Sequence, residues 1–72
     1  MSTYTWSAKN NSSFLNGERS ASSKLSAVRA AKAYVRGELF GEGIITIREN
    51  GEDIEWHERS IHTGMKWEKG QC

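Results

Sequence analysis

Proline is absent from this sequence of 72 residues, cysteine occurs once, and long apolar runs are missing. Because the only cysteine is Cys72, no disulfide can form within the chain, although secreted domains of this size usually need disulfides. No apolar run approaches the length of a signal-peptide core or of a membrane span. These absences favour a cytoplasmic protein with no membrane partner.

Motifs for catalysis and for cofactor binding are also missing. The chain has neither a Gly-rich phosphate loop nor a Gly-x-Ser-x-Gly nucleophile motif. Cys72 with His57 or His62 would be the one thiol–imidazole pair, and a cysteine beyond Gly70 is poorly held for catalysis. The two histidines, with Glu58 or Cys72, match no closed metal site. We therefore expect no enzyme activity, no metal, no cofactor and no small-molecule substrate.

The composition that remains is that of a folded protein. Hydrophobic residues make up 36% of the chain and charged residues 26%, and three Trp, two Tyr and two Phe supply bulk for a core. A chain this short buries only about 60% of its unfolded surface, so we expect one small domain over residues 1–72. We further expect a flexible loop at about residues 10–22 and a frayed tail from about residue 69.

Residues 3–9 alternate between apolar and polar side chains, which predicts a half-buried strand. The core face of this strand holds Tyr4, Trp6 and Ala8. The next stretch is rich in Asn, Ser and Gly and predicts a loop, with a small turn at Asn16–Gly17 anchored by Phe14 or Leu15.

A helix is predicted to follow this loop. Ser22 or Ser23 is a suitable N-cap, and the helical pattern runs to about Gly37 or Phe40. Apolar residues share one broad arc of this helix, which would pack on a sheet. They are Ala27, Val28, Ala31, Tyr34, Val35 and Leu39.

Residues 43–60 predict a β-hairpin, because Asn50–Gly51 separates two alternating runs and suits a two-residue type I′ turn. The register set by this turn pairs Glu49 with Glu52, Arg48 with Asp53, Ile47 with Ile54, Thr46 with Glu55, Ile45 with Trp56 and Ile44 with His57. One face then collects the apolar side chains Ile45, Ile47, Ile54 and Trp56.

The tail beyond the hairpin alternates weakly at Met65 and Trp67, which predicts a short final strand with Gly64 as a bulge. The predicted fold class is α+β, in the order β-α-β-β(-β), with one helix packed on a small antiparallel sheet.

The net charge of +1 conceals an uneven distribution. Residues 1–36 carry six Lys or Arg and one Glu, a charge of +5, whereas residues 37–72 carry four Lys or Arg and eight Asp or Glu, a charge of −4. The predicted helix bears a basic stripe formed by Arg29, Lys32 and Arg36, with Lys24 nearby. Such a stripe can contact a partner's phosphates or carboxylates, or it can be only a solvated helix face.

Acidic residues gather on the predicted hairpin and form a secondary candidate surface. They are Glu49, Glu52, Asp53 and Glu55, with Glu58 beside them. Carboxylates on a rigid hairpin can imitate the spacing of phosphates and engage a basic partner, or they can simply keep the hairpin soluble and blunt its edge.

The chain combines a Ser-capped helix rich in Ala, Lys and Arg, a Gly-separated Ile-rich strand, an Asn-Gly turn and a Lys-Trp pair near the C-terminus. These features lie in SKLSAVRAAKAYVRGELFGEGIITIRENGEDIEWHERS and in MKWEKGQC, over roughly residues 20–70. This layout resembles small phage-encoded anti-CRISPR proteins that act on type I surveillance complexes. Proteins of that group bind the guide-RNA-loaded filament and block target DNA.

The resemblance implies a partner that is a protein or ribonucleoprotein complex of the host cell, met in the host cytoplasm. We therefore expect a small binding protein that inhibits a CRISPR-type nucleoprotein complex by blocking its nucleic-acid path. The basic stripe is the expected contact, with the acidic hairpin as the competing surface. The alternative expectation is a direct nucleic-acid-binding module that uses the same basic helix.

Overall fold

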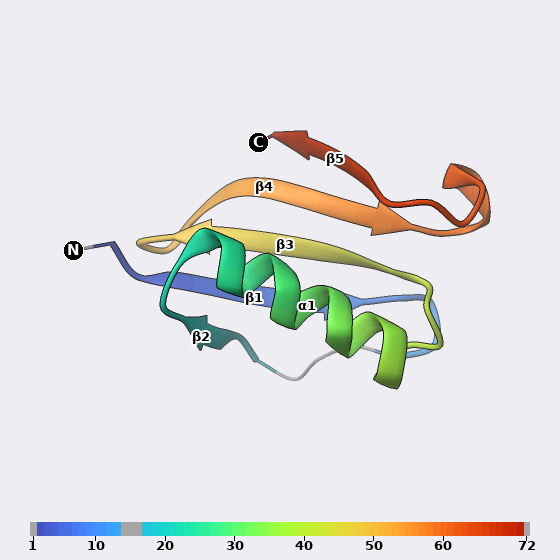
Figure 1. Ribbon diagram of the computed structural model, residues 1–72, viewed down its shortest axis with the longest axis horizontal. Helices are drawn as coiled ribbons and strands as arrows, with labels where there is room; N and C mark the ends of the chain where they lie inside the picture. Colours follow the sequence, from blue (N-terminus) through green and yellow to red (C-terminus); the bar gives the residue numbers. More distant parts are fainter. Residues whose placement is uncertain (1, 14–16, 72) are drawn as a thin grey trace.

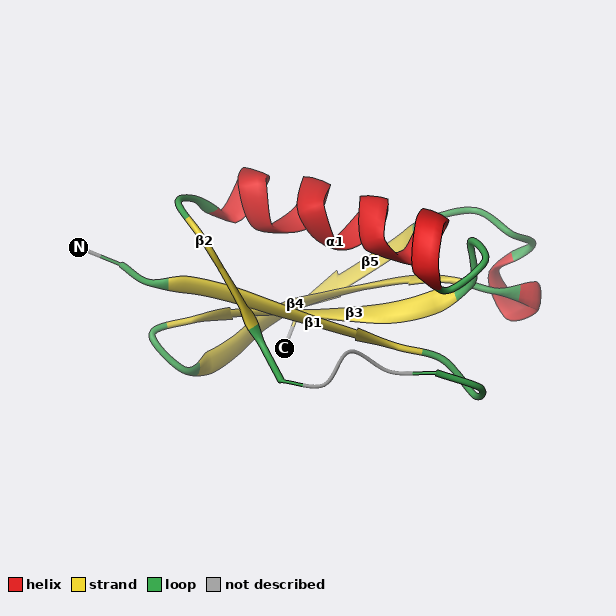
Figure 2. Ribbon diagram, turned by 90° about the horizontal axis from the view of Figure 1, so that it is seen from below, coloured by secondary structure: helices red, strands yellow, loops and turns green. Residues whose placement is uncertain are grey.

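In the computed structural model, which describes residues 2–13 and 17–71, the described residues form five strands, one α-helix and a short 3₁₀ helix (Figure 1). In chain order the elements are β1 (Tyr4–Lys9), β2 (Arg19–Ala21), α1 (Lys24–Glu38), β3 (Gly43–Glu49), β4 (Glu52–Arg59), η1 (Ile61–Thr63) and β5 (Glu68–Gln71). The strands form one antiparallel sheet in the order β2-β1-β3-β4-β5. Helix α1 covers one face of this sheet (Figure 2), which confirms the predicted α+β fold class.

Helix α1 begins and ends where local sequence signals predict. Ser23 is the N-cap, and its hydroxyl oxygen accepts a hydrogen bond from the backbone N–H of Ser26 at 3.1 Å. Leu39 is the C-cap, and the chain then turns through Phe40 and Gly41, whose φ angles of 59° and 81° are left-handed. Within the described residues no helix has both the length and the apolar composition to cross a membrane.

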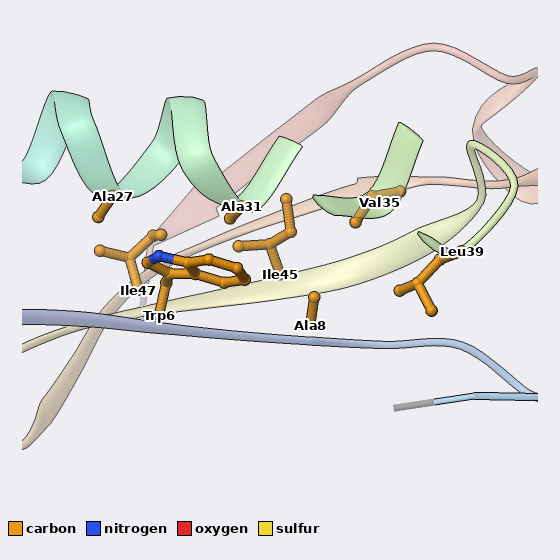
Figure 3. Close-up of a cluster of buried hydrophobic side chains, with 8 residues drawn as sticks. All are labelled: Trp6, Ala8, Ala27, Ala31, Val35, Leu39, Ile45 and Ile47. Carbon is orange, nitrogen blue, oxygen red and sulfur yellow. The ribbon is translucent and has the colours of Figure 1, made fainter. Parts of the chain in front are cut away.

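The core lies between α1 and the strands β1 and β3 (Figure 3). Alanines on the inner face of α1 let the helix approach the sheet closely, and the bulk is supplied mainly by Trp6, whose ring centre lies 5.8 Å from that of Tyr34. The buried apolar residues are Trp6, Ala8, Ala27, Ala31, Val35, Leu39, Ile45 and Ile47. The predicted core faces of β1 and α1 are therefore confirmed, with Val28 and Tyr34 partly buried at the margin.

The hairpin of β3 and β4 has the predicted turn but not the whole predicted register. Asn50 and Gly51 both have left-handed φ angles, 53° and 85°, as a two-residue turn requires. The first pairs, Glu49 with Glu52 and Arg48 with Asp53, are as predicted, and beyond them Ile47 pairs with Glu55, Thr46 with Trp56 and Ile45 with His57. Ile54 is thus an extra residue in β4, and this β-bulge shifts the rest of the strand by one position.

The bulge exchanges the two faces of β4. Glu55 and His57 lie on the helix side and are only 3% and 4% exposed. Trp56 lies on the opposite side and is half-buried, so its predicted place among the apolar residues of the core face is wrong. Its neighbour there is Gly70 of β5, where an added Cβ would come within 2.3 Å of the indole ring. Only glycine therefore leaves room for this tryptophan.

Two strands lie in ranges that the sequence assigns to a loop and a tail. β2 falls within residues 10–22 and pairs with β1, and β5 continues past residue 69 and pairs with β4. Gly64 is not a bulge: it is the C-cap of η1, with a φ of 69°. The turn predicted at Asn16–Gly17, with Phe14 or Leu15 as its anchor, falls on residues 14–16, which lie outside the described residues.

Candidate partner-binding surfaces

Two of the four predicted basic residues turn toward β4 and the segment before β5. The Nζ atom of Lys24 lies 3.2 Å from Oε2 of Glu55. The Nζ atom of Lys32 lies 5.2 Å from the ring centre of Trp67, a cation–π distance. Both lysines are thus engaged within the protein, which leaves the two arginines of the stripe as the remaining candidates among the predicted basic residues.

Arg29 and Arg36 lie on the outward side of α1 and are exposed. Across residues 2–13 and 17–71, neither arginine takes part in an ion pair. Between them and beside them runs a strip of exposed small residues at helical spacing, Ser26, Ala30, Ala33 and Gly37. We call this surface, two arginines and the small-residue strip, the outer helix face. Its low relief allows a partner's backbone to approach the helix closely while the guanidinium groups reach further out.

The predicted acidic surface is smaller than the sequence implies. Glu49, Glu52 and Asp53 lie at the hairpin tip, but Asp53 is ion-paired with Arg48. Hydrogen bonds from Ser2 and from Tyr4, whose hydroxyl lies 3.1 Å from Glu49, hold the pKa of Glu49 below its ordinary value of 4.5. Two of the three carboxylates at the tip are therefore already bound within the protein.

Glu55 does not lie on the acidic surface where the sequence places it. Its Oε1 atom lies 2.6 Å from Nε2 of His57 and 3.9 Å from Nζ of Lys69, and Oε2 accepts the contact from Lys24. We call these four residues the Glu55 cluster. The cluster joins the start of α1 to β4 and β5, because Glu55 of β4 contacts Lys24 of α1 and Lys69 of β5.

Protonation in the Glu55 cluster follows from burial and from these partners. Burial raises the pKa of Glu55, but the hydrogen bonds and charges of Lys24 and His57 together outweigh burial and hold this pKa below 4.5. Burial is the largest cause that lowers the pKa of His57 below 6.5, and the charges of Lys32 and Lys69 lower it further. The hydrogen bond and charge of Glu55 raise this pKa but do not reverse the shift. At neutral pH Glu55 is therefore charged and His57 neutral. Because a carboxylate only accepts, Nε2 of His57 carries the proton and donates to Glu55.

A shallow hollow of about 400 Å³ lies beside this cluster. It is lined by Tyr4, Lys24, Glu49, Ile54, Glu55 and Gln71. The hollow brings one residue of the predicted basic set together with two of the acidic set, and Lys24 already neutralises Glu55. A charged ligand would have to displace that contact, so the hollow is a poor binding site. Among the described residues, no group of three or more His, Cys, Asp or Glu is placed to hold a metal ion.

Sequence reasoning missed the burial of Glu55 and His57. The alternation of β4 is ambiguous, because the strand has polar residues at both phases. The available signal was the pair of Trp56 and Gly70, since a tryptophan beside a strand glycine is a favourable cross-strand arrangement. No family model, no curated protein and no solved structure matches the chain, so the interpretation of its surfaces depends on their geometry.

Proposed function

We propose that this protein is a small binding protein that inhibits a CRISPR-type nucleoprotein complex by blocking its nucleic-acid path. The outer helix face is the proposed contact surface. One observation supports this choice of surface: Arg29 and Arg36 are exposed and have no ion-pair partner in the described residues. The helix that carries them is held in place by the core. The layout's resemblance to anti-CRISPR proteins supports the choice of partner.

The geometry favours a protein contact over a groove for nucleic acid. Arginine is enriched at interfaces between proteins, and the outer helix face presents two exposed arginines beside a strip of small residues that a partner can approach closely. Arginines at the edge of such a face pair well with carboxylates of a partner, since the guanidinium group presents a planar fork of donors. A domain with extents of 36 × 22 × 17 Å is large enough to obstruct a channel that admits a single duplex of nucleic acid.

The test is the double variant Arg29→Glu/Arg36→Glu against a reconstituted type I surveillance complex. Both side chains are exposed, so the variant should fold, and its binding should weaken at least tenfold, about 1.4 kcal/mol. Isothermal titration measures the affinity, and a target-DNA binding assay measures inhibition by the same protein samples.

The matched control is the double variant Glu52→Lys/Asp53→Lys, which reverses two charges at the hairpin tip. The proposal expects this variant to bind and inhibit as the parent protein does. Normal binding by the helix variant together with lost binding by the hairpin variant would assign the contact to the acidic tip instead. Absence of binding by the parent protein would remove the CRISPR-type complex as the partner.

The second candidate is a direct nucleic-acid-binding module that uses the same helix. Arg29 and Arg36 recur at i and i+7, two turns apart, so they lie on one side of α1 and can both reach the phosphates of one strand. This candidate predicts binding to DNA without any protein partner, and that binding should weaken as salt is raised.

A further inference from the structure

Large apolar side chains are exposed at the end of the molecule where α1 ends, β3 begins and β4 runs into η1 (Figure 1). Phe40 is 87% exposed and Ile61 77%, and Ile44 and Met65 are each 39% exposed. Figures 1 and 2 both place the segments that carry these residues at the same end of the molecule, remote from the hairpin tip, and Ile44 and Ile61 line one groove there. Exposed apolar residues that lie together, as Ile44 and Ile61 do, mark a contact surface.

The backbone at Phe40 supports this interpretation. Its φ of 59° is left-handed, and the position directly after a helix C-cap is one that glycine usually takes. A phenylalanine there gains no burial and carries a backbone penalty, so neither packing nor local conformation accounts for it. Aromatic anchors of this kind are typical of protein–protein contacts.

A groove of about 230 Å³ lies at this end and combines apolar with acidic lining. Ile44 and Ile61 form its apolar part, and Glu42 and Glu58 supply two carboxylates. Its remaining lining residues are Asn10, Asn11, Gly43, Ser60 and His62. Glu42 and Glu58 are half-buried, and neither is in an ion pair anywhere in residues 2–13 and 17–71. The groove therefore offers two carboxylates that are in no ion pair among the described residues.

Hydrogen bonds hold the walls of this groove in place. The side-chain amide of Asn10 donates to the carbonyl oxygens of Leu39 and Glu42, at 3.3 and 3.0 Å. The Ser60 hydroxyl donates to Oε2 of Glu58 at 2.7 Å, which fixes that carboxylate and leaves Oε1 for another donor. A groove with fixed walls is preorganised for a ligand.

We propose that this groove binds an arginine side chain from an extended segment of a partner protein. The guanidinium group would lie between Glu42 and Glu58, its methylene stem would lie on Ile44 and Ile61, and a neighbouring apolar residue of the segment would pack on Phe40. Arginine fits because it joins a long apolar stem to a planar cation that pairs with carboxylates. This surface is independent of the outer helix face, has the opposite charge, and goes beyond the proposed function.

The probe is the tripeptide acetyl-Leu-Arg-Leu-amide, titrated into the isotope-labelled full chain and followed by backbone amide NMR. We expect saturable shifts at Gly43, Ile44 and Ile61, with a dissociation constant on the order of 1 mM for so small a ligand. The matched control peptide carries citrulline in place of arginine. Citrulline keeps the shape but not the charge, and it should bind more weakly by about fivefold or more.

The variant Glu58→Gln separates recognition of charge from recognition of shape. It should weaken binding of the arginine peptide by about fivefold and leave the citrulline peptide unaffected. If Glu58→Gln loses the dispersed amide spectrum of the folded protein, Glu42→Gln takes its place in the same comparison. Equal binding of the two peptides, or no saturable shifts, overturns the proposal. Shifts at these same amides that grow with protein concentration alone also overturn it, because they identify a second copy of the chain as the occupant.

Discussion

Glu55 and His57 are buried together because each supplies what the other lacks. A lone carboxylate in the interior would lose its hydration, and the His57 N–H and the two lysines replace the lost water contacts. No buried side-chain nitrogen or oxygen among the described residues lacks a hydrogen-bond partner. A polar network that is satisfied in this way stabilises the fold only while its protonation state is kept.

We predict that the free energy of unfolding decreases as the pH falls below 6.5. Because the pKa of His57 is lowered in the folded protein, the unfolded chain binds a proton first, and stability falls from 6.5 down to that lowered pKa. The pKa of Glu55 is also lowered, so a second loss begins near 4.5 and continues down to the folded pKa. Urea unfolding at a series of pH values above and below 6.5 measures both losses.

The variant His57→Gln is the control for this pH dependence. A glutamine amide can still donate to Glu55 but does not titrate, so the loss that begins at 6.5 should shrink while the loss near 4.5 persists. An unchanged loss below 6.5 in this variant would assign the effect to a group other than His57.

At the scale of elements, the sequence predicts the structures that depend on local signals but not those that depend on contacts between distant residues. Helix α1 and the Asn50–Gly51 turn were predictable because their caps, periodicity and turn residues lie within a few positions of one another. The bulge at Ile54 was not, since it places Trp56 over a glycine fourteen positions along the chain and Glu55 beside a lysine of the helix. The face of β4 is therefore decided by tertiary contacts.

In the candidate site, too, only the features that depend on local spacing could be predicted from the sequence. Helical spacing alone puts Arg29 and Arg36 on an exposed side of α1, and the structure agrees. Spacing could not show that Lys24 contacts Glu55 or that Lys32 contacts the ring of Trp67, because those partners belong to β4 and to the segment before β5. The predicted stripe of basic residues thus reduces to two arginines.

We predict that Gly70→Ala lowers the free energy of unfolding by about 1–3 kcal/mol, the usual cost of overpacking. The new Cβ would lie 2.3 Å from the Trp56 indole, so the ring or strand β5 must move. In a Trp56→Val background, the same change should cost less than about 0.5 kcal/mol, because the indole is gone. Urea unfolding of the four proteins measures this coupling. If Gly70→Ala costs the same free energy in the parent protein and in the Trp56→Val background, the indole does not cover Gly70. That result would favour the hairpin register without a bulge.

At the scale of the whole molecule, the fold mixes the two halves of the charge distribution. Basic charge of the first half meets acidic charge of the second half in the ion pair of Lys24 with Glu55, and Arg48 of the second half pairs with Glu18 of the first. Strand β1 of the first half also lies beside β3 of the second half in the sheet. The halves therefore do not form two separate surfaces of +5 and −4. The two surfaces proposed for partners are therefore local: arginines on the outer helix face along α1, and carboxylates in the groove near the C-terminal end of α1.

This distribution predicts weak binding to duplex DNA. If Arg29 and Arg36 neutralise two phosphates, the logarithm of the binding constant should fall with the logarithm of salt with a slope of about −1.8, far less than that of proteins that neutralise many phosphates. A gel shift over a salt series should therefore show little complex at physiological ionic strength, and Arg29→Glu/Arg36→Glu should remove any complex seen at low salt. A tight complex with a slope of about −5 or steeper would require more cations than the outer helix face presents. That result would favour direct nucleic-acid binding, through cations beyond the outer helix face, over inhibition through a protein contact.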